Sequence, residues 1–306
     1  MRGSIVEKYK NVFVIAQKEF ADNIWSPRLA ILILVFTAIV FSISYDSGIG
    51  PEGNAISGGY LNISHIVSLF LPFMGIALGF DAISKERESG SLNVLLTHPI
   101  YRDNIIAGKT LGAMITLVLV VFISIFTVLG TILLASGTEL SSPILNRLVI
   151  FAILTYLYLS IFLSLGILSS IVTKNATKSL VYNIAIWVVL CIVFGMICAT
   201  TASIITEHKP TDLDDNERFL GLNADIQKLT PAHHYAMAVS GVPSLSWLGL
   251  SSERSSVRGI FDMEHTLEQW WSELWINVLI LIITPIFLII MAFITFLRQD
   301  VSKDMG

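Results

Sequence analysis

One short motif in the sequence is typical of phosphate binding: Gly108-Lys109-Thr110. A phosphate-binding loop needs the pattern G-x-x-x-x-G-K-[ST] between a strand and a helix, because its glycines let backbone N–H groups converge on the phosphates. Asp103 stands where the first glycine is required, and no soluble strand is expected before it. We therefore interpret Lys109 as a cationic anchor at the mouth of an apolar helix. No nucleotide or other cofactor is expected on this chain.

A dense group of charges, Lys85-Glu86-Arg87-Glu88-Ser89-Gly90-Ser91, lies shortly before this motif. The glycine is expected to break the preceding helix, and a short new helix would begin at Leu92 and stop before Pro99. The sequence thus predicts a compact elbow over 84–109 with apolar anchors and a charged rim, as in a protein-docking surface. An ordinary connector between two spans would account for the basic residues of this group but not for its two glutamates.

A third candidate is a pair of possible metal ligands, His233 and Met237, which would share one helix face. Such a pair could bind a soft metal such as copper. Adjacent histidines point in different directions on a helix, however, and no third ligand has suitable spacing. We therefore favour a structural or partner-contacting role and predict no metal site.

The elements that must position these residues are apolar helices. The chain has 306 residues, of which 54% are hydrophobic and only 14% charged, a composition that excludes an ordinary soluble domain. Stretches of about 20 apolar residues can cross a bilayer as helices. We predict an all-α integral membrane protein with six transmembrane helices, over roughly 29–45, 63–83, 111–135, 148–172, 179–205 and 274–297.

The orientation follows from lysine and arginine, which accumulate in short cytoplasmic segments. The N-terminal segment, the second and fourth connections and the C-terminal tail are basic, whereas the opposing short loops contain only Arg147. Both termini are therefore predicted to lie in the cytoplasm, in a multi-pass protein of the cell (inner) membrane.

Four segments follow from this topology. Residues 1–28 have an apolar stripe at helical spacing and are predicted to form an amphipathic helix in the cytoplasmic interface, in contact with lipid. Residues 29–205 would hold the first five spans and the elbow, and 273–306 the sixth span and the tail. The acidic stretch 206–272 would be a helical extracytoplasmic insertion.

Within this insertion, "TPAHHYAMAVSG" predicts a short helix. Thr230 would be its N-cap, Pro231 its first residue, and Gly241 would follow its end. A second helical piece leads into the last span, and its tryptophans are predicted to form an interfacial belt: Trp270, Trp271 and Trp275.

The spans themselves give limited information on cargo. Apart from Asp81, no ionisable residue is expected between the interfaces. This favours an externally powered machine over an ion-coupled secondary carrier, which usually needs such residues. Tyr156, Ser160 and Ser164 share one face of the fourth span and would either line a pathway or pack helices together. An uncharged interior suits an amphipathic or lipid-like cargo.

The segment "KERESGSLNVLLTHPIYRDNIIAGKTLG" resembles the region between the second and third spans of type-two ABC transporter permeases, with the pattern E-x-E-x-G-[ST]-L, L-L-[ST]-x-P, x-R and G-K. The "TPAHHYAMAVSG" helix and the six-span plan are similar as well. The subgroup that contains the permease for nitrous-oxide reductase maturation is the nearest in pattern.

The resemblance implies a half-transporter that pairs with a second permease copy and with two ATP-binding subunits, which carry ATP and Mg. The chain would not be an enzyme by itself. The elbow would be the coupling helix of an exporter or extractor, contacting those subunits through Glu86, Arg87, Glu88, Gly90, Leu92, Pro99 and Arg102. An extracytoplasmic protein could meet the 206–272 insertion, and no nucleic-acid partner is expected. The alternative is a non-transporting scaffold or sensor for such an extracytoplasmic protein.

Overall fold

The computed structural model shows a bundle of helices, and no strand occurs in the residues it describes. The structure describes residues 2–48, 64, 67–91, 101–136, 142–173, 175–207, 217–242, 259–262 and 265–299. Five helices are long and apolar enough to cross a membrane, and a bent pair supplies a sixth span. The predicted fold class, an all-α integral membrane protein, is confirmed.

The N-terminal part of the chain forms a bent pair of helices. Helix α1 (Arg2–Ile24) and helix α2 (Pro27–Gly48) are separated by two residues, and their axes differ by 59°. Pro27 suits the first position of α2, where its missing N–H is not needed, and it cannot continue α1. The predicted first span corresponds to α2.

The second span, Val67–Glu88, is interrupted. Helix α4 (Pro72–Gly79) is separated by a short turn from helix α5 (Ser84–Glu88). The turn exposes backbone donors that need partners at membrane depth. The Ser170 hydroxyl accepts from the backbone N–H groups of Ile83 and Ser84, both at 2.9 Å. A side chain from another span thus stabilises the break.

Helix α8 (Ser142–Val172) is the central helix of the bundle and packs closely against α4. A Cβ atom on Gly75 would lie 2.7 Å from the Leu159 carbonyl oxygen, and one on Gly79 would lie 2.6 Å from that of Leu163. Small residues let transmembrane backbones approach in this way. The glycines of the second span are therefore needed for helix packing.

The remaining spans follow the predicted order. Helix α7 (Arg102–Ser136) begins well before the predicted residue 111, so the end of the elbow region is already helical. The fifth span comprises α9 (Ala176–Val188), one π-helical turn and α10 (Phe194–Thr206). The sixth is α13 (Leu267–Arg298), with the predicted helical lead-in continuous with the span.

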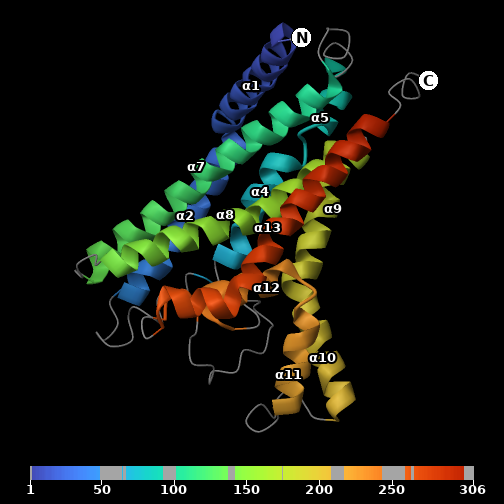
Figure 1. The fold of residues 1–306 in the computed structure, drawn as a ribbon. Coiled ribbons are helices and arrows are strands. Elements are labelled where there is room, and N and C mark those ends of the chain that lie inside the picture. Colours follow the sequence, from blue (N-terminus) through green and yellow to red (C-terminus); the bar gives the residue numbers. More distant parts are fainter. Residues whose placement is uncertain are drawn as a thin grey trace.

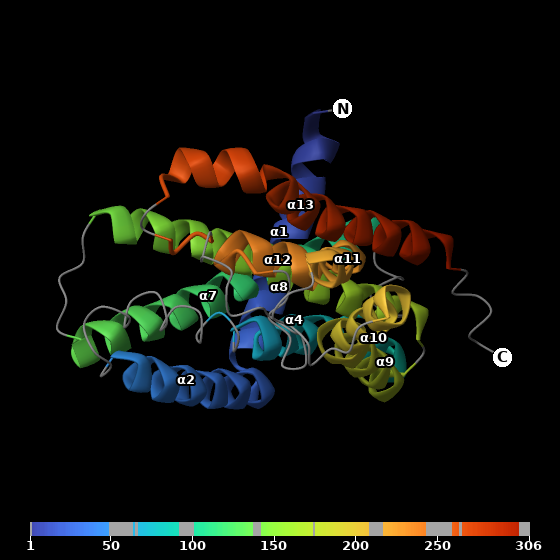
Figure 2. The same cartoon turned by 90° about the horizontal axis from the view of Figure 1, so that it is seen from below.

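Two shorter helices precede the last span: α11 (Glu217–Gln227) and α12 (Pro231–Ser240). The predicted helix is confirmed in α12: the Thr230 hydroxyl accepts from the His233 N–H, and Gly241 ends the helix with φ +72°. Helix α12 packs on α8 and α13, whereas α11 packs on α10. Figure 2 shows α12 lying across the bundle.

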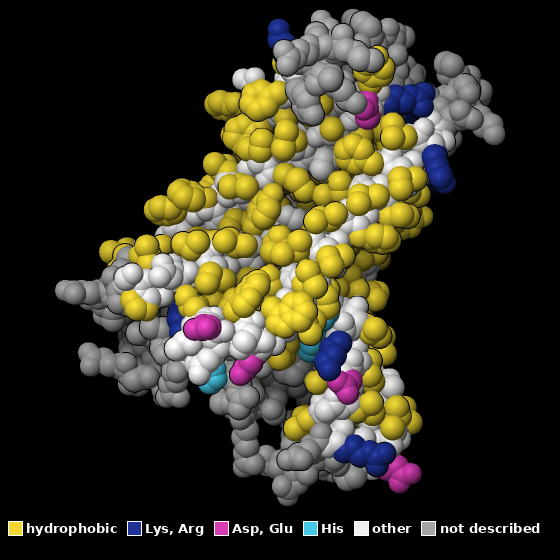
Figure 3. Space-filling view, viewed as in Figure 1, with side chains coloured by type: hydrophobic (Ala, Val, Ile, Leu, Met, Phe, Trp, Pro, Cys, Tyr) yellow, Lys and Arg dark blue, Asp and Glu magenta, His cyan; other side chains and the backbone are white. Residues whose placement is uncertain are grey.

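The N-terminus, α5 and the C-terminal end of α13 lie at one end of the molecule, and α11 and α12 lie toward the other (Figure 1). This is the arrangement that the predicted topology requires. On the face shown in Figure 3, apolar side chains cover the middle, while charged side chains lie toward the two ends. We call these the termini end and the α12 end.

Candidate coupling site at the termini end

Lys109, the lysine of the phosphate-loop-like motif, is the centre of a buried ion-pair cluster. Its Nζ lies 2.8 Å from Glu19 Oε2 of α1 and 3.0 Å from Glu86 Oε1 of α5. Only 8% of the Lys109 side chain is exposed. The prediction of a simple surface anchor was therefore incomplete: the lysine joins three helices. We call Glu19, Lys109 and Glu86 the triad.

The glycine of the same motif has a packing role. Gly108 and Gly112 are one helical turn apart on the face of α7 that meets α1. A Cβ on Gly108 would lie 2.6 Å from the Ile15 side chain, and one on Gly112 would lie 2.6 Å from the Ala16 carbonyl oxygen. This small-x-x-x-small pattern lets α1 lie directly on α7, so α1 packs along one side on protein.

A second ion pair joins the first two spans. Arg28 at the start of α2 lies 2.8 Å from Asp81, and its guanidinium carbon is 5.1 Å from the centre of the Phe80 ring. Asp81 is the one ionisable residue within the predicted spans, and this contact accounts for it. Because half of the Arg28 side chain is exposed, the pair is screened by solvent.

Two predicted coupling residues, Arg87 and Arg102, bind the end of α13. Arg87 donates to Gln299 Oε1 at 2.5 Å, and Arg102 donates to the Gln299 carbonyl oxygen at 3.0 Å. The Gln299 side chain continues the network, because its Nε2 donates to the Ile171 carbonyl oxygen of α8 at 2.8 Å. Gln299 thus links four helices at the termini end.

The rest of the elbow is more open. Glu88 accepts from the backbone N–H of Ala176 at the start of α9, at 3.1 Å. An acidic side chain is favoured at a helix N-terminus. Gly90 has φ +72°, which confirms the predicted break after the charged group, and Ser89 and Ser91 beside it are exposed. Leu92, Pro99 and the predicted short helix between them lie outside the described residues.

A polar cavity of about 550 Å³ lies beside the triad, between α1 and α5. Charges of both signs line it, including Lys18, Asp22 and Lys85. One triad atom, Glu86 Oε2, is buried without a hydrogen-bond partner, and so is Asn23 Nδ2. The cluster therefore has a spare acceptor on the side of α5.

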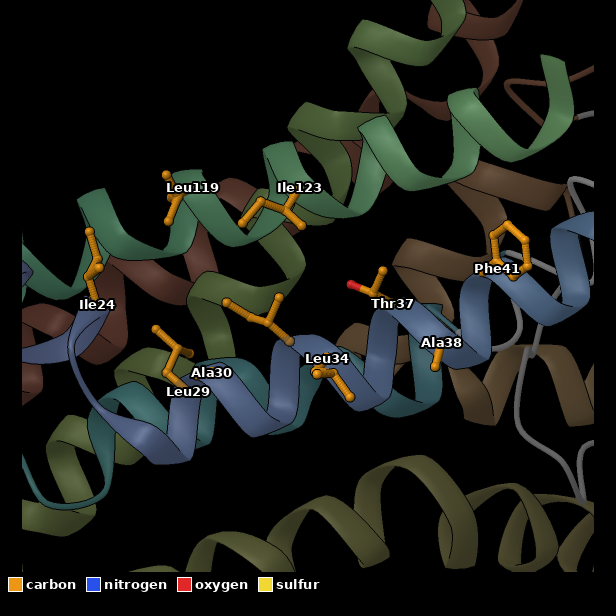
Figure 4. Close-up of a pocket in the computed structure, with 10 residues that line it drawn as sticks. Ile24, Leu29, Ala30, Leu34, Thr37, Ala38, Phe41, Leu119 and Ile123 are labelled. Carbon is orange, nitrogen blue, oxygen red and sulfur yellow. The ribbon is translucent and has the colours of Figure 1, made fainter. Parts of the chain in front are cut away.

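An apolar groove of about 750 Å³ runs between α2 and α7, beginning at the α1–α2 corner (Figure 4). Apart from Thr37 its lining is apolar, and it consists of Ile24, Leu29, Ala30, Ile33, Leu34, Thr37, Ala38, Phe41, Leu119 and Ile123. We call it the α2–α7 groove.

The candidate pathway residues lie in the middle of α8. The Ser160 and Ser164 hydroxyls are buried and donate to carbonyl oxygens one turn earlier, at 2.7 and 2.6 Å. Tyr156 lines an otherwise apolar hollow between α7 and α8. Both hydroxyls thus bond within α8 itself, and the pathway and helix-packing roles both stay predictions.

The α12 end is held by aromatic side chains. The Tyr235 ring of α12 stacks on Tyr158 of α8 with centroids 4.5 Å apart, and its hydroxyl pairs with Thr155 at 3.0 Å. Burial raises the pKa of Tyr235. Trp270 is buried and donates to the Ala238 carbonyl oxygen at 2.9 Å. Its assignment to an interfacial belt was wrong, although Trp271 is exposed.

Arg147, the lone basic residue of the opposing short loops, is also buried at the α12 end. Its guanidinium donates to the carbonyl oxygens of Ile260, at 2.5 Å, and His265. Both acceptors belong to the chain that leads into α13. The residue thus fastens this segment to α8.

The metal candidates belong to α12 as well. His233 is buried, and Met237 packs against the core. The neighbouring His234 is held between Asn277 Oδ1, at 2.7 Å, and the Lys228 carbonyl oxygen, at 2.9 Å. The part of the chain that the structure describes contains no group of three or more His, Cys, Asp or Glu placed to hold a metal.

Sequence reasoning missed two residues of the termini end, Glu19 and Gln299. Neither belongs to a recognisable motif, and their partners are far away in the chain. The GKTLG sequence did contain a usable signal, since glycines four residues apart predict close helix packing.

Six spans, an interrupted second span and a charged elbow at the end that holds both termini define a multi-pass membrane protein of the permease type. A family model described as ABC-2 family transporter protein matches residues 13–301, and the chain belongs to this family. This confirms the resemblance stated from the elbow sequence.

Two curated relatives are similar to part of the chain. Both are named "Probable ABC transporter permease protein NosY": that of Stutzerimonas stutzeri is 31% identical over 134 residues, and that of Pseudomonas aeruginosa is 29% identical over 137. The matches cover 42% and 44% of this chain. The chain spans about half the length of these relatives, 48% and 50%.

Proposed function

We propose that this chain is the membrane subunit of a transporter in which two separate ATP-binding subunits hydrolyse ATP and drive export or extraction of a substrate. A second copy of the chain would complete the pathway. ATP and Mg would be bound by the partner subunits. The membrane would be the cell (inner) membrane, with both termini in the cytoplasm.

The observation that carries this proposal is the charged elbow. It lies at the end of the molecule where α1 begins and α13 ends, and it presents an exposed turn, Ser89–Ser91, after helix α5. In α5, Arg87 is hydrogen-bonded to Gln299 and Glu86 is paired with Lys109. A rigidly supported turn with an open tip is suited to transmit a push from a partner. Glu86 and Arg87 support the elbow, so Glu88 and Gly90 are the better candidates for direct contact.

The test is ATP hydrolysis by the chain assembled with an ATP-binding subunit in proteoliposomes. Glu88→Ala combined with Gly90→Val should reduce hydrolysis stimulated by the membrane subunit at least fivefold, because the contact surface and its left-handed turn are both altered. Glu273→Ala, an exposed carboxylate change at the α12 end of α13, is the matched control and should leave hydrolysis unchanged.

Other results would point elsewhere. Hydrolysis that ignores the elbow variant in a fully assembled complex would contradict coupling and favour the scaffold. Ion-driven transport by this chain alone in liposomes would establish a secondary carrier. Nucleotide binding by the purified chain would also contradict the proposal.

A further inference from the structure

We infer that the triad of Glu19, Lys109 and Glu86 is a mechanical relay that makes the elbow and α1 move as one body and thereby sets the width of the α2–α7 groove. The three residues act as positioning residues. This inference rests on the proposed function, because the elbow must be displaced by a partner.

The first step is the position of the three residues along the chain. Glu86 lies in the first part of the elbow, at the end of the second span, and Lys109 is its last residue, near the start of α7. Their contact at 3.0 Å therefore clamps together the two flanks of the elbow. A push on the tip between them is then shared by both spans.

The second step concerns α1, which is separated from the elbow along the chain by the first span and most of the second. Glu19 reaches the same ammonium group at 2.8 Å. The exposed fractions of the Glu19 and Glu86 side chains are 15% and 18%. Charged contacts with so little water are stronger than surface pairs, and separating them leaves an uncompensated buried charge. Sliding of α1 along the elbow is therefore resisted.

The third step is the seam beneath the triad. Gly108 and Gly112 bring α1 into backbone contact with α7 on both sides of Lys109. The Ile15 and Glu19 side chains occupy the space that side chains at positions 108 and 112 would need. The same Glu19 side chain ends in the ion pair with Lys109, so packing and charge together hold the register of α1 along α7.

The fourth step leads from α1 to the groove. Ile24 ends α1 and Leu29 lies in the first turn of α2, across the 59° corner, and both line the α2–α7 groove opposite Leu119 (Figure 4). Because α1 is held to α7 by the triad and is joined to α2 at the corner, a displacement of the elbow is passed to the start of α2, which forms one wall of the groove. The triad thus links the proposed site of ATP-driven motion to this apolar groove.

The experiment measures distances in the complete complex. Spin labels at Gln17→Cys on α1 and Lys85→Cys on α5 are each paired with Asn146→Cys, which lies in α8 at the α12 end, away from the contacts between the elbow and Ser170. All three positions are exposed, and the native cysteines are buried. Distances are recorded without nucleotide and after trapping with ATP and vanadate. In the otherwise native chain, both pairs should shift.

The decisive variant is Glu19→Gln/Glu86→Gln/Lys109→Met, which removes the relay without leaving an unpaired charge, a replacement that buried ion clusters often tolerate. We expect the 85–146 shift to persist and the 17–146 shift to fall by at least half. Lys18→Met, an exposed lysine of the same cavity, is the control and should change neither shift. An undiminished 17–146 shift in the triple variant would overturn the relay.

Failure of the proposed function gives a different result, in which neither pair shifts even in the native chain, and this would overturn both proposals. If a variant does not assemble with the partner subunits, the thermal stability of the isolated chain still tests the triad. The Tm effects of Glu19→Gln and Glu86→Gln should be non-additive with Lys109 present and additive with Lys109→Met. Additive effects in both backgrounds would contradict the relay.

Discussion

The two ends of the bundle hold their helices together by different interactions. At the termini end, ionised side chains from several helices meet one another, as in the contacts of Lys109 with Glu19 and Glu86. At the α12 end, a buried arginine donates to main-chain carbonyls, and aromatic rings stack between α12 and α8.

This difference has a mechanical meaning. The ion pairs of the triad tie α1, α5 and α7 into one unit that can move as a body, whereas the stacked rings tie α12 to the central helix α8 in a close-packed core with one good arrangement. The termini end is therefore suited to repeated displacement, and the α12 end is suited to remain fixed. The comparison predicts that substitutions at the α12 end act mainly on stability and those at the termini end mainly on coupling.

The largest effect is expected for Tyr235→Ala at the α12 end. It removes a fully buried ring and leaves Thr155 without its partner, so we expect a loss of about 3–5 kcal/mol of unfolding free energy. Denaturant unfolding in mixed micelles measures it. Tyr235→Phe keeps the stack and should cost only about 1 kcal/mol. Equal losses for the two variants would show that the hydroxyl, and not the stack, holds α12.

Lys109→Met at the termini end should cost about 3 kcal/mol, because two carboxylates then face each other without a cation. Adding Glu19→Gln and Glu86→Gln should restore most of this loss. If the triple variant were as unstable as Lys109→Met, the lysine would contribute to stability through packing of its aliphatic side chain and not through its charge. In that case the contrast between the two ends would weaken.

Arg147→Met should cost about 2 kcal/mol, because the carbonyl oxygens of Ile260 and His265 lose their donor in a buried place. The segment ahead of α13 should then become cleavable by protease added at the α12 end, and ATP hydrolysis by the assembled complex should change little. A coupling defect without loss of stability would contradict the fixed character of this end.

The sequence was sufficient for the parts of the fold that depend on local pattern. The lengths of the apolar stretches predicted the six spans, and Thr230-Pro231 at the start with Gly241 at the end predicted α12. It was insufficient where a residue's role depends on a partner far away in the chain. Lys109 at the mouth of a span has the same local pattern whether it faces water or the carboxylate of Glu19.

The interrupted second span illustrates the same limit. The sequence predicted a single span over 63–83, whereas the structure has a break stabilised by Ser170, which belongs to another helix. Trp270 was assigned to the lipid interface because its type and position near a span end are typical of a belt. Docking of α12 against α13 buried it instead, and such packing is decided by the whole fold.

The smallest effect is expected for Arg28→Gln, which removes the ion pair with Asp81 and the contact with the Phe80 ring. About half of the Arg28 side chain is exposed, so screening should limit the loss of stability to about 0–1 kcal/mol. Raising the salt concentration should weaken the native pair and shrink this difference further, as a salt series of unfolding curves can measure. Since the pair joins the start of α2 to the second span at the corner below the triad, a large and salt-independent loss would mean that the termini end is also held rigidly, and the contrast between a displaceable end and a fixed end would fail.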